Sequence, residues 1–141
     1  EKSPEVYWVR QRMEKTGVDF CLDVHGDEAI PHNFIAGPEG VPSFSKRQAK
    51  LLNNYKDALL QANPDFQLKH GYPANRPGKA NLKIGANWIA ERFGCLSMTL
   101  EMPFKDVDDG TEQRQGWSPA RSRALGRSNL DAIRAVLGNL R

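Results

Sequence analysis

Two ionisable side chains of this 141-residue chain lie where an apolar, strand-like segment meets a polar loop. His25 follows the apolar run of residues 18–24, and Glu101 lies at the end of a second run that begins at Cys95. An imidazole at the tip of a rigid strand is suited to bind a metal ion. A carboxylate is costly to bury unless it is paired, hydrogen-bonded or near a metal, and a raised pKa there suits a general base. His25 is therefore a candidate metal ligand, and Glu101 is a candidate catalytic base.

Each of these residues also has a purely structural interpretation. His25 could be a loop histidine that is hydrogen-bonded to the backbone, and Glu101 could be paired with a lysine or arginine. The other two histidines, His32 and His70, fit ordinary loop positions. The sequence contains no CxxC or HExxH metal motif, no glycine-rich phosphate loop and no GxSxG nucleophile motif.

The elements that must position these side chains alternate between helices and strands. Helices are expected over residues 4–16, 46–61, 85–93 and 119–137, and strands over 18–24, 33–36 and 95–102. This alternation predicts an α/β fold with three αβα layers and a mostly parallel sheet. Ligand-binding groups gather at the carboxyl ends of such strands. We therefore expect His25 and Glu101 at one sheet edge, with their tips within roughly 8 Å.

Helical spacing and capping residues give further expectations. Val6, Val9 and Met13 recur at helical spacing and should form the buried face of the first helix. In the second helix, Ser45 and Gln48 form a capping box. The residues expected to be buried there are Leu51, Leu52, Tyr55, Leu59 and Leu60.

Composition limits the class of protein. Hydrophobic residues make up 39% of the chain and charged residues 26%, which is typical of one soluble globular domain. No apolar run is long enough for a transmembrane helix, so no membrane partner is expected. The net charge of +3 is mild and the basic residues are scattered, so nucleic-acid binding is not expected. Cys21 and Cys95 both lie inside apolar runs, which favours two buried, reduced thiols over a disulfide and suits a cytoplasmic protein.

The combination of motifs is more specific than its parts. The chain resembles the zinc metallocarboxypeptidases, especially the bacterial branch similar to cytosolic carboxypeptidases, in DFCLDVHGDEAIPHNFIAGPEG and in GYPANRPGKANLKIGANWIAERFGCLSMTLEMPFKD. The resemblance covers nearly the whole chain. It implies that residues 1–141 are the C-terminal portion of a zinc carboxypeptidase catalytic domain.

The resemblance also implies roles for individual residues. His25 matches the later zinc-binding histidine of the family, and Glu101 matches the general base that activates water. The first two zinc ligands of the family, and the residues that grip the substrate carboxylate, lie upstream and have no match here. We therefore expect one zinc ion in the complete domain, weak or no zinc binding by this chain alone, and an upstream half of the domain as its partner.

Two weaker matches concern the substrate. Tyr72 lies in a Gly/Pro-rich loop where the family has a mobile tyrosine, although it could equally be a packed loop aromatic. Lys83 lies roughly where the glutamate-trimming branch has a basic residue, and its alternative is a solvated surface lysine. Both are candidate substrate-binding residues, and Lys83 would favour acidic C-termini.

The implied function is that of a cytoplasmic metallopeptidase that hydrolyses the C-terminal peptide bond of a peptide or protein. This chain alone would be incomplete and inactive. Two alternatives stay open: a non-catalytic binding or structural half-domain, and a related zinc amidohydrolase that acts as a deacylase.

Overall fold

A computed structural model gives the fold of the chain and describes residues 3–104 and 116–140. The acidic loop expected from Lys105 to Gly116 lies outside the described residues except for its last residue. The elements in chain order are α1 (Pro4–Thr16), β1 (Phe20–Asp27), β2 (Phe34–Ala36), α2 (Lys46–Ala62), α3 (Gly85–Phe93), β3 (Leu96–Pro103), α4 (Pro119–Val136) and the 3₁₀ turn η1 (Leu137–Asn139).

The three described strands form one sheet in the order β1-β3-β2. β1 and β3 are parallel neighbours, as predicted, and β2 pairs antiparallel with the other side of β3. The α/β class is confirmed, and the sheet within the described residues is mixed. β1 continues three residues beyond its predicted end, because His25, Gly26 and Asp27 stay in register with residues 101–103 of β3.

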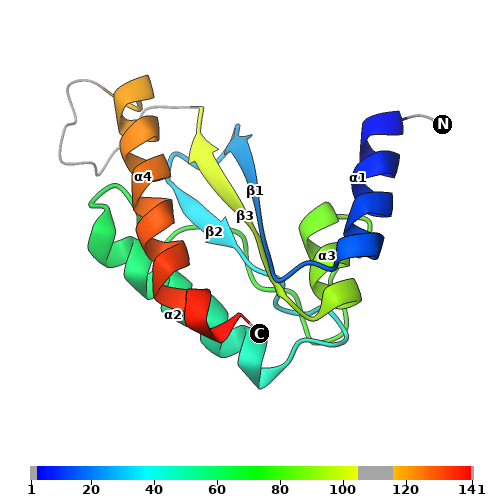
Figure 1. Cartoon of the computed structure of the whole chain (residues 1–141). Helices are drawn as coiled ribbons and strands as arrows, with labels where there is room; N and C mark the ends of the chain where they lie inside the picture. Colours follow the sequence, from blue (N-terminus) through cyan, green and yellow to red (C-terminus); the bar gives the residue numbers. More distant parts are fainter. Residues whose placement is uncertain (1–2, 105–115, 141) are drawn as a thin grey trace.

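Helices cover both faces of the sheet. α2 and α4 pack against each other on one face, whereas α3 contacts β3 and β1 on the other (Figure 1). Four of the five residues predicted to be buried in α2 are in the core, but Leu60 is exposed. The core is built from large apolar side chains on β3, α2 and α4, among them Leu51, Leu52, Tyr55, Leu59, Leu96, Met98, Leu125 and Val136.

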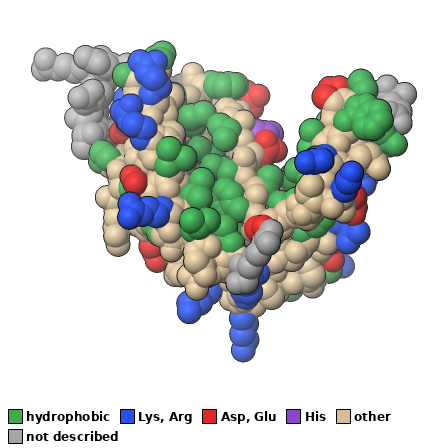
Figure 2. Space-filling model, in the orientation of Figure 1, with side chains coloured by type: hydrophobic (Ala, Val, Ile, Leu, Met, Phe, Trp, Pro, Cys, Tyr) green, Lys and Arg blue, Asp and Glu red, His purple; other side chains and the backbone are tan. Residues whose placement is uncertain are grey.

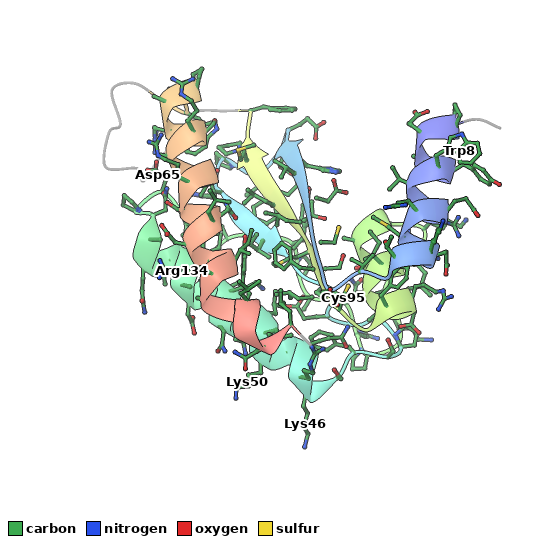
Figure 3. All side chains as sticks on the ribbon, viewed as in Figure 1. Trp8, Lys46, Lys50, Asp65, Cys95 and Arg134 are labelled. Atoms are coloured by element: carbon green, nitrogen blue, oxygen red, sulfur yellow. The ribbon has the colours of Figure 1, made fainter. Side chains whose placement is uncertain are left out.

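The predicted buried face of α1 is wrong. Val6 is 55% exposed, Val9 is 52% exposed, and no residue of α1 is buried. The helix forms an arm that stands beside α3, and hydrophobic side chains gather near its outer end (Figures 1 and 2). Trp8 lies on this arm and points away from the body of the molecule (Figure 3). The helical spacing predicts the helix correctly, but no described residue buries the apolar face of that helix.

Local sequence signals explain the ends of several elements. The Ser45 side chain accepts a hydrogen bond from the Gln48 N–H, and the Gln48 side chain accepts one from the Ser45 N–H, so the predicted capping box begins α2. Both cysteines are free thiols: Cys95 is buried and Cys21 is half-buried. Among the described residues, no helix has both the length and the apolar character needed to cross a bilayer.

Candidate active site

His25 and Glu101 occupy facing positions on β1 and β3. Residues paired in a parallel ladder carry their side chains on the same face of the sheet, and so do residues two apart on one strand. Asp23 and Thr99 are the pair two residues earlier on the same strands. All four side chains line one hollow of about 380 Å³. The expectation that His25 and Glu101 lie at one edge of the sheet is confirmed.

Glu101 is buried, with 7% of its surface exposed. Its Oε2 accepts no hydrogen bond from any described residue. Burial raises the pKa of Glu101 above its ordinary value, and the charge of His25 opposes that rise. The carboxylates of Asp27, Glu28 and Asp23 raise this pKa further. A buried carboxyl with an unpartnered oxygen and a raised pKa has the properties required of a general base.

His25 is held by a carboxylate on its own strand. Its Nε2 lies 3.1 Å from Oδ1 of Asp23, and both side chains are about half exposed. This contact orients the ring and engages Nε2, so Nδ1 is the nitrogen left to bind a metal. The side chain of His25 thus has the support that a metal-binding imidazole usually receives in proteins.

Gly26 allows a close contact between the ends of two strands. The ring of Phe104 lies over it, and a Cβ at residue 26 would be only 2.0 Å from Cε1 of that ring. The close approach brings the end of β3 against the end of β1, next to His25.

Tyr72 lies on the wall of the same hollow. Its ring packs edge-on against Phe34, with the ring centroids 4.9 Å apart. Its hydroxyl donates a hydrogen bond to Oδ2 of Asp27, a residue that is only 4% exposed. This bond, together with burial, raises the pKa of Tyr72. Asp27 was not predicted as a site residue, although its place two residues after His25 on β1 puts it on the same face.

The two lysines near this region lie in different places. Lys83 is exposed and lines a second hollow, between α1 and α3, that includes Val9 and Trp88. Lys56 of α2 lines the hollow of Glu101, with its Nζ 3.3 Å from Oε1 of Glu39. The structure therefore does not bring Lys83 into the pocket of Glu101. It does place there a lysine that sequence reasoning missed, because the helical pattern of α2 marks Lys56 only as a polar position.

The described residues supply only part of a catalytic metal site. Catalytic zinc sites use three protein ligands and keep one position open. Within residues 3–104 and 116–140, no group of three or more His, Cys, Asp or Glu side chains could hold a metal ion. His25 supplies one suitable nitrogen, and the unpartnered oxygen of Glu101 fits a base beside a metal, but further ligands would have to come from other polypeptide.

The chain is similar along its length to solved carboxypeptidases. It is 45% identical to a metallo-carboxypeptidase from Pseudomonas aeruginosa, whose structure is a complex with (2-guanidinoethylmercapto)succinic acid, at a TM-score of 0.93. It is 44% identical to a metallo-carboxypeptidase from Burkholderia cenocepacia at a TM-score of 0.89. The similarity covers 99% and 96% of this chain, respectively. The resemblance to the metallocarboxypeptidases is thereby confirmed in both sequence and fold.

These matches involve only part of each relative. The chain spans 37% of the Pseudomonas protein and 36% of the Burkholderia protein. An uncharacterized protein of Zymomonas mobilis is 52% identical over 140 residues, which are 99% of this chain and 37% of that protein. No protein-family profile matches the chain. The chain therefore corresponds to little more than a third of the length of proteins of this class.

Proposed function

We propose that the chain is the C-terminal portion of the catalytic domain of a zinc-dependent metallocarboxypeptidase. The observation that carries this proposal is the pairing of His25 with Glu101 on adjacent parallel strands, with a buried, unpartnered carboxylate oxygen at Glu101. The similarity to solved metallo-carboxypeptidases supports it. The reaction would be hydrolysis of the last peptide bond of a peptide or protein.

In this proposal four residues of the site have defined roles. Glu101 takes a proton from water and passes it to the leaving amine, for which a raised pKa is suited. Nδ1 of His25 would be a ligand of zinc, and Asp23 orients the ring. Tyr72 contacts the substrate from the wall of the pocket. Zinc, when bound, would polarise the scissile carbonyl and acidify water.

The remaining zinc ligands would come from an upstream half of the domain. Two features support a docking place for that half. β1 is an edge strand of the described sheet, and the apolar face of α1 is exposed. An edge strand presents unpaired backbone groups to a further strand. The 141-residue chain alone would then be inactive.

A preference for acidic C-termini is the finer part of the proposal. Lys83 remains the first candidate, because the segment 82–85 borders both hollows: Lys83 lines one, Ile84 lines the other, and Gly85 lines both. Lys56 is the second candidate, because it already lies in the pocket of Glu101.

The experiment that tests this function measures release of the C-terminal residue by mass spectrometry. The full-length protein, loaded with zinc, would be given matched peptides that end in Glu or in Leu. We expect release of one residue, stopped by a chelator and restored by zinc. Lys83→Ala should lower kcat/KM tenfold to a hundredfold on the Glu peptide alone. Internal cleavage, or removal of an acyl group instead, would overturn the proposal. If only Lys56→Ala abolishes the preference for the Glu peptide, Lys56 rather than Lys83 binds the acidic side chain.

A further inference from the structure

One lysine and one glutamate form an ion pair in the wall of the hollow that contains Glu101. Nζ of Lys56, on α2, lies 3.3 Å from Oε1 of Glu39, in the loop that follows β2. The two side chains are 20% and 30% exposed, respectively, and both residues line the hollow. Charges that are partly withdrawn from water are screened less by salt than charges on the surface. Both charges therefore act on a group that enters the hollow.

Glu39 is held in place by its backbone and by a neighbouring glycine. The N–H of Val41 donates to the carbonyl of Pro38 at 3.1 Å, which closes a turn around Glu39. A Cβ at Gly37 would overlap Oε2 of Glu39, so the glycine lets this carboxylate lie against the backbone. The other oxygen, Oε1, is the one that pairs with Lys56. The position of the carboxylate is therefore defined by packing as well as by charge.

The ion pair limits how much of the lysine charge is available to a substrate. Among the described residues, Lys56 is the only lysine or arginine that lines this hollow. Because its ammonium already has a carboxylate partner, an acidic side chain that enters the hollow must compete with Glu39 for it. The charge of Glu39 also repels that side chain. The pair has no net charge, and it therefore gives the pocket little attraction for an acidic side chain while Glu39 is present.

We propose that Glu39 is a specificity-determining residue, which pairs with Lys56 and thereby weakens the binding of acidic C-terminal side chains in this pocket. This inference rests on the proposed function and adds to it a residue that opposes an acidic preference. The paired wall suits an uncharged, polar side chain better, because the ammonium can donate to an oxygen while the carboxylate accepts from an N–H. A preference for acidic C-termini would then have to come from another cation, such as Lys83.

The test uses the zinc-loaded full-length protein and two peptides that end in Glu or in Gln, which have the same shape and differ in charge. The measured quantity is the ratio of kcat/KM for the Glu peptide to kcat/KM for the Gln peptide. Glu39→Gln should raise this ratio about tenfold, because the ammonium of Lys56 is then free to bind the substrate carboxylate. Asp57→Asn is the matched control: it removes the same charge from an exposed residue of α2 that does not line the hollow. It should leave the ratio unchanged.

Two further variants show whether Glu39 acts through Lys56. Lys56→Met keeps an unbranched side chain and removes the charge. Alone, it should lower the ratio, because Glu39 is then unpaired and repels the substrate carboxylate. When Lys56→Met is combined with Glu39→Gln, neither residue of the pair is charged, and the ratio should return to near the value of the unmodified protein.

Three results would overturn the inference. One is a ratio that Glu39→Gln changes no more than Asp57→Asn does. Another is a ratio in the double variant that stays as high as in Glu39→Gln alone, since Lys56 would then not be involved. The third is a ratio that Lys56→Met alone leaves unchanged or raises, a comparison that stays valid even if Glu39→Gln does not fold. Failure of the proposed function looks different, because then no variant releases a residue from either peptide.

Discussion

Two opposing influences act on the carboxyl of Glu101. Burial favours its neutral form, and the nearby His25 favours its charged form. Burial is the larger of the two, so the pKa of Glu101 is raised. Burying a carboxylate in this position destabilises the folded protein. The raised pKa that results is suited to a general base.

The cost should be visible as a pH-dependent stability in the metal-free full-length protein. Because the folded-state pKa of Glu101 is raised, its contribution is fully present below the unfolded pKa and is lost as pH rises through the folded pKa. Glu101→Gln removes this loss. The free energy of unfolding of the variant should therefore rise relative to that of the wild type as pH rises from about 4 to 8. The difference should be about 1.4 kcal/mol for each tenfold decrease that folding causes in the acid dissociation constant of Glu101. Urea unfolding at several pH values measures this, and a difference that does not change with pH would contradict it.

The long loop that forms one wall of the pocket is packed closely against Gly40. Gly40 has φ +94°, and a Cβ there would lie 2.5 Å from Cβ of Asn75 and 2.8 Å from the carbonyl oxygen of Arg76. The N–H of Ala80 also donates to the Gly40 carbonyl, at 2.9 Å. The segment that carries Tyr72 is thus packed directly on Gly40 and its neighbours.

Gly40→Ala should therefore destabilise the full-length protein by about 1–3 kcal/mol and raise KM, because Asn75 must move. Gly78→Ala is the matched control: its φ is also positive, at +71°, but no atom lies within 4 Å of the added Cβ. It should cost only the backbone strain, about 1–2 kcal/mol, and leave KM unchanged. Thermal unfolding and steady-state kinetics compare the two. Equal effects of both variants on KM would show that the close contact at Gly40 does not support the pocket.

Much of this site could be predicted from sequence because it lies on strands. Two apolar runs, with His25 directly after the first and Glu101 near the end of the second, are enough to place His25 and Glu101 together. Asp27 could not be predicted as a site residue, because the polar residues after His25 indicate that the strand ends there. In the structure, pairing with β3 extends β1 as far as Asp27. The Tyr72 loop has no periodicity, so its contact with Asp27 depends on long-range packing that no local pattern encodes.

Two features of the described residues agree with the upstream half of the domain proposed above. The apolar face of α1 was predicted to be buried, and it is exposed because nothing in the described part of the chain covers it. The described residues also offer no set of three metal ligands. Both findings agree with a chain that spans 37% of the Pseudomonas metallo-carboxypeptidase.

Metal binding should therefore depend on the length of the polypeptide. We expect the full-length protein to hold about one zinc ion per chain after dialysis, because catalytic sites use three protein ligands. The 141-residue chain should hold little, since His25 alone is a weak site. In the full-length protein, His25→Ala should lose the metal. Metal analysis with circular dichroism as a check of folding measures this, and tight stoichiometric zinc in the 141-residue monomer would contradict it.

The proposed role of Glu101 as the base of a hydrolytic site can be tested by kcat for release of a C-terminal residue. The zinc-loaded full-length protein would be compared with its Glu101→Gln variant. Asp131→Asn, which removes an exposed carboxylate on α4 outside the pocket, is the control. We expect kcat to fall about 10²–10⁴-fold for Glu101→Gln, with zinc retained, and to stay unchanged for the control. Near-normal turnover by Glu101→Gln would rule out Glu101 as the base.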